Sequence, residues 1–370
     1  MTPRTPTPPT ATPPAEVSAE SIADLKRRLR SFRSVETAGR GWDRGVDPDY
    51  LRRLVDYWAT DYDWTVHERR IRALGWQTAG RTTPIRLMHR FVSAEAPTVV
   101  LLHGWPDSVL RFERVLPLLD DVNLVVPALP GFPFALPVPE GGLPAHRMAE
   151  AVADAMTDLG YERYVVSAGD IGTDVAEAIA RSRPDAVAAM HLADVSQRHA
   201  LDDPPRDPSD AERDYLRRVS DWQATEGAYA HEQGTKPQTL AVGLGDSPAG
   251  LAAWILEKLR RWSDNDGDLA SVFSLDEVLT WISVYWFEGS IGTSFVPYAG
   301  GARSLQRVET PVAVTLFPKE PVSPNEEFAA RYLNVQSWQE FDHGGHFSAW
   351  ERPHDYVTGV RAALALAAAP

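Results

Sequence analysis

The chain of 370 residues contains no cysteine. This absence excludes disulfide bonds, catalysis by a thiolate and metal sites with cysteine ligands, and it leaves the redox compartment open. Positive charge is also scarce, since 37 Lys and Arg residues stand against 51 Asp and Glu residues, for a formal net charge of −14. This acidity argues against nucleic acid or an anionic membrane as the main partner.

Long apolar runs are missing from the start of the chain. Residues 1–17 are rich in Pro, Thr and Ala, so we expect a disordered lead-in that is neither a signal peptide nor a membrane anchor. With 44% hydrophobic and 24% charged residues, the composition is typical of a soluble globular protein, and we expect it in the cytoplasm. This length predicts one main domain with an elaboration, or two domains.

Helical periodicity precedes the first run of buried strands. Apolar residues at helical spacing predict helices within 18–33, 48–59 and 61–74. Alternating residues in 75–79 and 84–92 then predict an antiparallel hairpin. Residues 18–95 are therefore expected to form an N-terminal extension.

Short β-rich apolar runs, separated by helical stretches, fill much of the remaining chain. The runs are 98–104, 122–130, 162–169, 186–194, 308–318 and 336–345. This alternation predicts an α/β fold with a mostly parallel central sheet covered on both faces.

We assign residues 96–195 and 297–370 to the core of this fold. Residues 196–296 are helical in pattern, rich in Trp and interrupted by Pro, and we expect a cap over the carboxyl ends of the strands. Many of the twelve tryptophans lie there, which fits either an aromatic pocket or simple core packing.

Residues 164–180, YVVSAGDIGTDVAEAIA, have the pattern of a buried strand, a turn of small residues and a helix, with Asp170 at the apex. A nucleophile elbow needs small residues near the apex, because the strand reverses sharply into the helix. A carboxylate there predicts attack on a carbon that can be alkylated, which gives an ester between protein and substrate. The alternative is a glycine-rich turn in which Asp170 caps a helix.

The sequence HGWP at 103–106 follows a predicted strand and opens a loop. In a hydrolase with an elbow, the loop after the third strand supplies one N–H for the oxyanion, and the residue after the nucleophile supplies the other. The pattern therefore predicts the backbone amides of Trp105 and Ile171. An ordinary turn with His103 in the core would explain the dipeptide HG alone.

Two histidines, His343 and His346, lie in residues 340–353, after the last predicted strand. A general base occupies such a loop, and Gly344 and Gly345 would permit close approach to a nucleophile. We predict His346 as the base, with His343 as the alternative.

Three carboxylates follow the strand at 308–318. Glu320 lies nearest the strand end, where a carboxylate could orient the histidine and stabilise its cation. Glu326 and Glu327 are expected to be solvated residues at a helix start. The order nucleophile, acid, histidine is that of α/β-hydrolases, although surface charge alone would explain any one of these acids.

HGWP at 103–106, the aspartate elbow and GGHF at 344–347 are motifs in which this chain resembles the microsomal-type epoxide hydrolases of the α/β-hydrolase superfamily. The most specific match is YAHEQGTKPQTLAVGLGDSPAGLAAWILEK at 229–258, and FPKE at 317–320 falls on the family's acid position. The resemblance spans roughly residues 18 to 365. It implies an α/β-hydrolase fold with an inserted helical cap and the family's own N-terminal region.

The family uses two tyrosines, and the matching positions are Tyr229 before HEQGTKP and Tyr298 in SFVPYAGG. Without the resemblance, both would be taken as packing residues of the cap. The resemblance implies that they hold the epoxide oxygen and donate a proton while Asp170 forms a hydroxyalkyl ester. His346, oriented by Glu320, then activates the water that releases a vicinal diol, with no metal and no cofactor.

Ile171 departs from the family pattern, because many relatives, and haloalkane dehalogenases too, carry Trp there. The backbone amide is unaffected, but an indole N–H that could hold a departing halide is lost, which argues against dehalogenation. The eukaryotic membrane-bound relatives have an apolar anchor, and we expect this protein to be soluble and to have none.

Two other classes of function stay open: another hydrolase of this fold, a haloalkane dehalogenase or esterase, and a non-catalytic protein that binds an apolar ligand under its cap.

For the epoxide hydrolase, the expected substrates are a small apolar or aromatic epoxide and water. The composition suggests a bacterial source. Enediyne antibiotic pathways use such enzymes on aryl epoxides, so a biosynthetic role stands beside detoxification. A homodimer is included among the expected assemblies.

Overall fold

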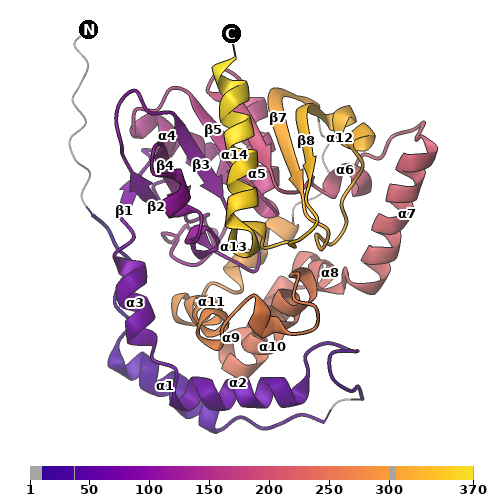
Figure 1. Cartoon of the computed structure of the whole chain (residues 1–370). Helices are drawn as coiled ribbons and strands as arrows, with labels where there is room; N and C mark the ends of the chain where they lie inside the picture. Colours follow the sequence, from indigo (N-terminus) through magenta and orange to yellow (C-terminus); the bar gives the residue numbers. More distant parts are fainter. Residues whose placement is uncertain (1–10, 37, 300–305, 370) are drawn as a thin grey trace.

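A single sheet forms the centre of the protein. The computed structural model describes residues 11–36, 38–299 and 306–369. Within them, eight strands lie in the order β1-β2-β4-β3-β5-β6-β7-β8 (Figure 1). The strands are β1 Trp76–Ala79, β2 Ile85–Arg90, β3 Thr98–Leu102, β4 Asn123–Pro127, β5 Tyr164–Ala168, β6 Val187–Leu192, β7 Val308–Leu316 and β8 Leu333–Glu340. β2 runs antiparallel to β1 and β4, and the other pairs are parallel. The predicted α/β fold with a mostly parallel sheet is confirmed.

Helices cover both faces of this sheet. α4 (Ala145–Asp158) and α5 (Ile171–Ser182) pack against each other on one face, and α14 (Pro353–Ala368) lies along β6 and β7 on the other (Figure 1). Every residue of β3, β4 and β5 is buried, because a parallel sheet covered on both sides has no solvated face. Shorter helical elements complete the core: η1 Val109–Phe112, η2 Leu116–Leu119, α12 Glu326–Tyr332 and α13 Ser348–Glu351.

The regular elements between β6 and β7 are all helical in the described residues. They are α6 Arg198–Leu201, α7 Asp210–Thr225, α8 Ala228–Thr235, α9 Pro237–Asp246, α10 Pro248–Trp262, η3 Leu269–Ser271, α11 Leu275–Glu288 and η4 Thr293–Ala299. Capping boxes start α7 and α11. Pro237 is the first residue of α9 and Pro248 is the first residue of α10, and the chain bends by 115° between these two helices. In the described chain no single helix is long and apolar enough to cross a membrane. The bent pair of α9 and α10 reaches that length and hydropathy only when its two helices are counted together.

The helical part of the N-terminal extension packs against the cap, on the side away from the sheet (Figure 1), whereas its predicted hairpin supplies β1 and β2 of the sheet. Its helices are α1 Ala19–Arg30, α2 Pro48–Thr60 and α3 Trp64–Arg72. The Tyr57 hydroxyl donates to Asp276 Oδ1 at 2.8 Å, and the Tyr62 and Thr280 hydroxyls are 3.0 Å apart. The helices of the extension therefore contact and stabilise α11, which is one of the cap helices.

Two expectations about chain segments need correction. Residues 1–10 of the predicted disordered lead-in lie outside the described residues, but Thr12 and Val17 are hydrogen-bonded to the folded body. The Thr12 N–H donates to the Trp76 carbonyl at 2.9 Å, and the Val17 N–H donates to Glu68 Oε1 at 2.7 Å. This order has a physical reason, because β1 is an edge strand with backbone groups left to satisfy. The last strand, expected at 336–345, occupies 333–340, and the glycines lie in the loop after it.

Candidate active site

Asp170 lies in a strained turn between β5 and α5. Its backbone φ of 58° and ψ of −132° are unusual for a residue with a side chain and cost roughly 1–3 kcal/mol. The Asp170 N–H donates to Asp194 Oδ2 at 2.7 Å, and the Thr173 hydroxyl donates to the other Asp194 oxygen. These bonds hold the turn so that the Asp170 side chain faces the cap.

A backbone donor already meets the Asp170 carboxylate. The Trp105 N–H donates to Asp170 Oδ1 at 2.7 Å. Ile171 is the first residue of α5, and an N–H at that position has no acceptor within its own helix. The Trp105 amide therefore contacts the carboxylate, and the Ile171 amide belongs to the next residue along the chain.

His346 joins Asp170 to Glu320. Its Nε2 lies 3.5 Å from Asp170 Oδ2, and its Nδ1 lies 3.1 Å from both oxygens of Glu320. Two backbone contacts fix the histidine: its N–H donates to the Trp262 carbonyl at 2.8 Å, and its carbonyl accepts from Arg111 Nη2 at 2.7 Å. The alternative base lies elsewhere, since the His343 side chain is 73% exposed. Glu326 and Glu327 are exposed in the first turn of α12, as predicted.

The two carboxylates govern the charge of this histidine. Burial alone would lower the pKa of His346, but the charges of Glu320 and Asp170 outweigh burial and raise that pKa from 6.5 to about 9. The two carboxylates therefore favour the imidazolium form of His346 in the free site.

Tyr229 from α8 and Tyr298 from η4 face the same space. Their ring centroids are 6.0 Å apart, and Tyr229 stacks on Trp105 at 5.3 Å. Burial raises the pKa of both phenols well above their usual value, and the nearby charge of Asp170 adds to the shift. Both phenols therefore keep their protons at any physiological pH.

One cavity of about 450 Å³ connects all five predicted side chains. Its lining includes Asp170, Tyr229, Tyr298, Glu320 and His346. It lies between the carboxyl ends of the strands and the cap, where open α/β sheets bind ligands. The structure thus brings the whole predicted set together. Among the described residues, no group of three or more His, Asp or Glu side chains could hold a metal ion.

The sequence reasoning missed Asp194, which lines the same cavity. Burial and the charge of Glu320 raise its pKa to about 7. A signal was present, because this acid is the last residue of a predicted strand run, 186–194. Its hydrogen bond from the Asp170 backbone N–H could not be deduced, since such a bond between distant residues leaves no pattern in the sequence.

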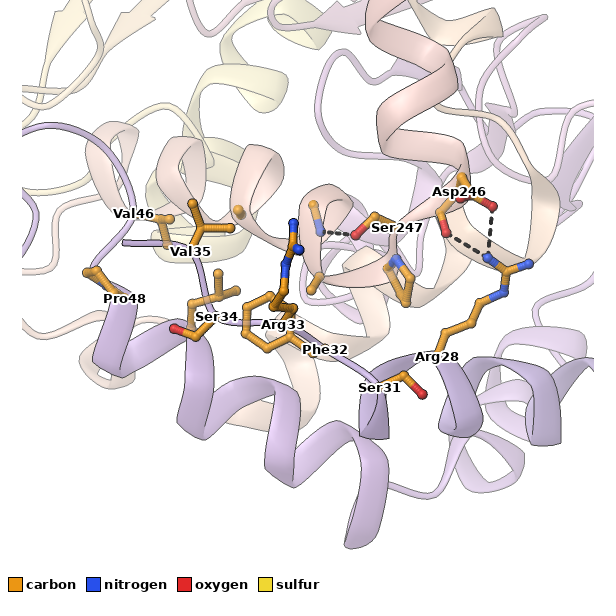
Figure 2. A pocket seen from close by; sticks show the side chains of 15 residues that line it. Arg28, Ser31, Phe32, Arg33, Ser34, Val35, Val46, Pro48, Asp246 and Ser247 are labelled. Carbon is orange, nitrogen blue, oxygen red and sulfur yellow. Dashed lines mark hydrogen bonds and ion pairs between the residues drawn. The ribbon is translucent and has the colours of Figure 1, made fainter. Parts of the chain in front are cut away.

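A second cavity of about 560 Å³ lies between the N-terminal extension and the cap (Figure 2). Phe32, Val46 and Pro48 contribute apolar surface, and Arg28 Nη1 donates to the carbonyl oxygen of Asp246 at 2.7 Å and to its Oδ1 at 2.9 Å. None of the predicted catalytic side chains lines this cavity. The chemistry therefore points to the cavity above Asp170.

Comparison with known proteins places the fold and this site in a class. The family model described as "alpha/beta hydrolase fold" matches residues 97–353, so the chain is an α/β-hydrolase. The model described as "Epoxide hydrolase N terminus" matches residues 12–112. A protein of Stigmatella aurantiaca, named "Putative epoxide hydrolase", is 35% identical over 363 residues, which is 93% of this chain and 82% of that protein. The chain belongs to the epoxide hydrolase family, as its motifs indicated.

Two solved structures are similar over almost their whole length. The epoxide hydrolase of Aspergillus niger has a TM-score of 0.85 and 27% identity, with 98% of each chain covered. The juvenile hormone epoxide hydrolase of the silkworm Bombyx mori has a TM-score of 0.82 and 26% identity, with 97% of this chain and 95% of that chain covered. The likeness therefore includes the extension and the cap as well as the core.

Proposed function

We propose that this enzyme opens an epoxide to a vicinal diol through an ester on Asp170. The observation that carries the proposal is the row Asp170, His346, Glu320 in one cavity, with the imidazole Nε2 3.5 Å from the aspartate and Nδ1 3.1 Å from the glutamate. Membership of the epoxide hydrolase family supports the same chemistry.

In the first step, the Asp170 carboxylate attacks one carbon of the epoxide. A carbon–oxygen bond forms, the ring carbon–oxygen bond breaks, and its electron pair goes to the epoxide oxygen. Tyr229 and Tyr298 hold this oxygen, and one phenol supplies its proton. Their raised pKa values support this role, since a phenol must be protonated to donate.

In the second step, His346 takes a proton from water as the water attacks the ester carbonyl carbon. The N–H groups of Trp105 and Ile171 stabilise the oxyanion, a contribution of roughly 3–4 kcal/mol per donor. The diol oxygen leaves with the proton from His346, and the acid proton on Asp170 restores the phenol. One water is consumed, and the diol is released.

Alkylation also prepares the base. The charge of Asp170 contributes to the raised pKa of His346, and an ester carries no such charge. Forming the ester therefore lowers this pKa, so the imidazolium gives its proton to solvent and the neutral imidazole can accept one from the attacking water. His346 takes a proton from solvent again when Asp170 regains its charge.

The proposed substrate is a small apolar or aromatic epoxide. The cavity has Trp222, Trp262 and Ile171 among its walls, which suits a ring, while Asp174 and Ser196 add polar groups at another part of it. An aryl epoxide from natural-product biosynthesis of the enediyne type falls within this class, beside simple epoxides met in detoxification. Turnover of a panel from styrene oxide to larger aryl epoxides would separate the two.

A trapping experiment tests the proposal. His346→Gln should form the ester and fail to hydrolyse it. Intact-protein mass spectrometry should then show a mass gain equal to one epoxide, and a digest should locate that gain in the peptide containing Asp170. His343→Gln is the matched control, because His343 is three residues away and exposed, and it should turn over normally. Free diol at the wild-type rate from His346→Gln would contradict the proposal.

A further inference from the structure

Lys258 on α10 buries its ammonium group among aromatic rings. The residue is 5% exposed, and its Nζ lies 4.6 Å from the ring centroid of Tyr229. The rings of Trp262 and Trp254 follow at 5.6 and 6.0 Å. Three rings therefore surround one cation, and the nearest ring belongs to a proposed proton donor.

This burial is unusual for a lysine. The side chain normally runs its apolar stem along the protein and keeps the ammonium in water. Here the ammonium forms an ion pair with the adjacent Glu257, whose side chain is 23% exposed, and also lies over the Tyr229 ring. The attraction between a cation and the face of an aromatic ring is strongest in a desolvated position such as this one.

We propose that Lys258 is a positioning residue that makes Tyr229 a better acid during ring opening. The inference rests on the proposed function. When the epoxide oxygen takes the proton of Tyr229, a phenolate remains whose negative charge extends into the ring. An ammonium at 4.6 Å from the ring centre stabilises this phenolate more than the neutral phenol.

The other groups around Tyr229 create the need for such a cation. Burial and the surrounding carboxylates disfavour a phenolate. The charges of Asp170 after β5, Glu320 after β7 and Glu257 on α10 raise the pKa of Tyr229, whereas its hydrogen bond with the phenol of Tyr298 acts in the opposite direction. In the described structure the ammonium of Lys258 lies over this ring. Its positive charge offsets the effect of the carboxylates as negative charge develops on Tyr229 in the transition state.

The test separates the two chemical steps in a single turnover, with ester and diol followed by rapid quench and mass spectrometry. Lys258→Met keeps the length of the side chain and removes its charge, so alkylation should slow by about tenfold while ester hydrolysis keeps its rate constant. Lys258→Arg should recover most of the loss. Glu257→Gln with Lys258→Met keeps the net charge and also removes a carboxylate that disfavours the phenolate, so its alkylation rate should lie between those of the wild type and the single variant. Lys258→Gln replaces the methionine variant if that does not fold.

A double-mutant comparison decides whether Lys258 acts through Tyr229. In a Tyr229→Phe background, Lys258→Met should cause no further slowing of alkylation. A full additional loss in that background, or equal slowing of both steps in the single variant, would overturn the inference and assign Lys258 to packing of the cap. Absence of any ester in the wild-type enzyme would instead overturn the proposed function, so the two failures are distinct.

Discussion

The charge on His346 depends on its two carboxylate neighbours. Glu320 contacts Nδ1 at 3.1 Å and holds the ring in place, whereas Asp170 faces Nε2 and loses its charge in the proposed ester. The same imidazole is therefore a cation while the nucleophile waits and a base after the nucleophile has reacted.

This coupling predicts the pH dependence of ester hydrolysis. The imidazolium form cannot accept a proton, so hydrolysis should speed up as pH rises through the pKa of His346. Because the ester removes the charge of Asp170, the midpoint should lie below the value of about 9 that belongs to the free site. The measurement is the rate constant of diol release in single turnovers at a series of pH values. A midpoint at or above 9 would contradict the coupling.

Some residues of the site could be read from the sequence because their roles are local. Asp170 and the two amides belong to short patterns of strand, turn and helix, so the chemistry could be predicted from neighbours along the chain. Tyr229 and Tyr298 were identifiable only through the resemblance. Asp194 and Lys258 were missed, because their significance comes from contacts with Asp170 and Tyr229 that only the folded chain creates.

The elbow depends on a close approach of two backbones. A Cβ on Gly172 would lie 2.4 Å from the Leu102 carbonyl oxygen and 2.8 Å from that of His103, and neither backbone atom can move aside. The glycine thus lets α5 begin directly against the end of β3, where the oxyanion loop starts. Small residues around the apex were predicted, but the atoms that require them were not.

Gly172→Ala should therefore destabilise the protein by about 1–3 kcal/mol and displace Asp170, with a larger loss in alkylation rate than in thermal stability. Gly243→Ala is the control, since Gly243 lies within α9 and a Cβ there meets no atom within 4 Å. That change should stabilise α9 by about 0.5–1 kcal/mol. Urea unfolding and turnover of styrene oxide measure both effects, and equal behaviour of the two variants would refute the account of the elbow.

At the scale of the whole molecule, three layers act together: the extension holds the cap, and the cap holds the tyrosines over the sheet. Trp64 on α3 is buried and lies 5.0 Å from the ring of Phe287 on α11, which spans the first of these boundaries. The sequence predicted the three segments separately. Their contacts could not be predicted, because helical periodicity shows that a face is apolar without showing what covers it.

Trp64→Ala should cost about 3–5 kcal/mol, because a large buried side chain would leave a cavity between extension and cap. Val66→Ala on the same helix is the control, since Val66 is 51% exposed and its loss should change stability by less than about 0.5 kcal/mol. Urea unfolding followed by tryptophan fluorescence gives both values. Equal stability of the two variants would show that the extension is not fastened to the cap through this contact.

The ester on Asp170 is the central claim, and a single turnover in ¹⁸O-labelled water tests it most directly. Excess unlabelled enzyme is mixed with styrene oxide, and the diol and the proteolytic peptides are weighed by mass spectrometry. Our account predicts a diol without ¹⁸O and the label in the peptide that contains Asp170, because water attacks the ester carbonyl. A diol that carries the label from the first turnover would mean that water opens the ring itself, and it would contradict the account.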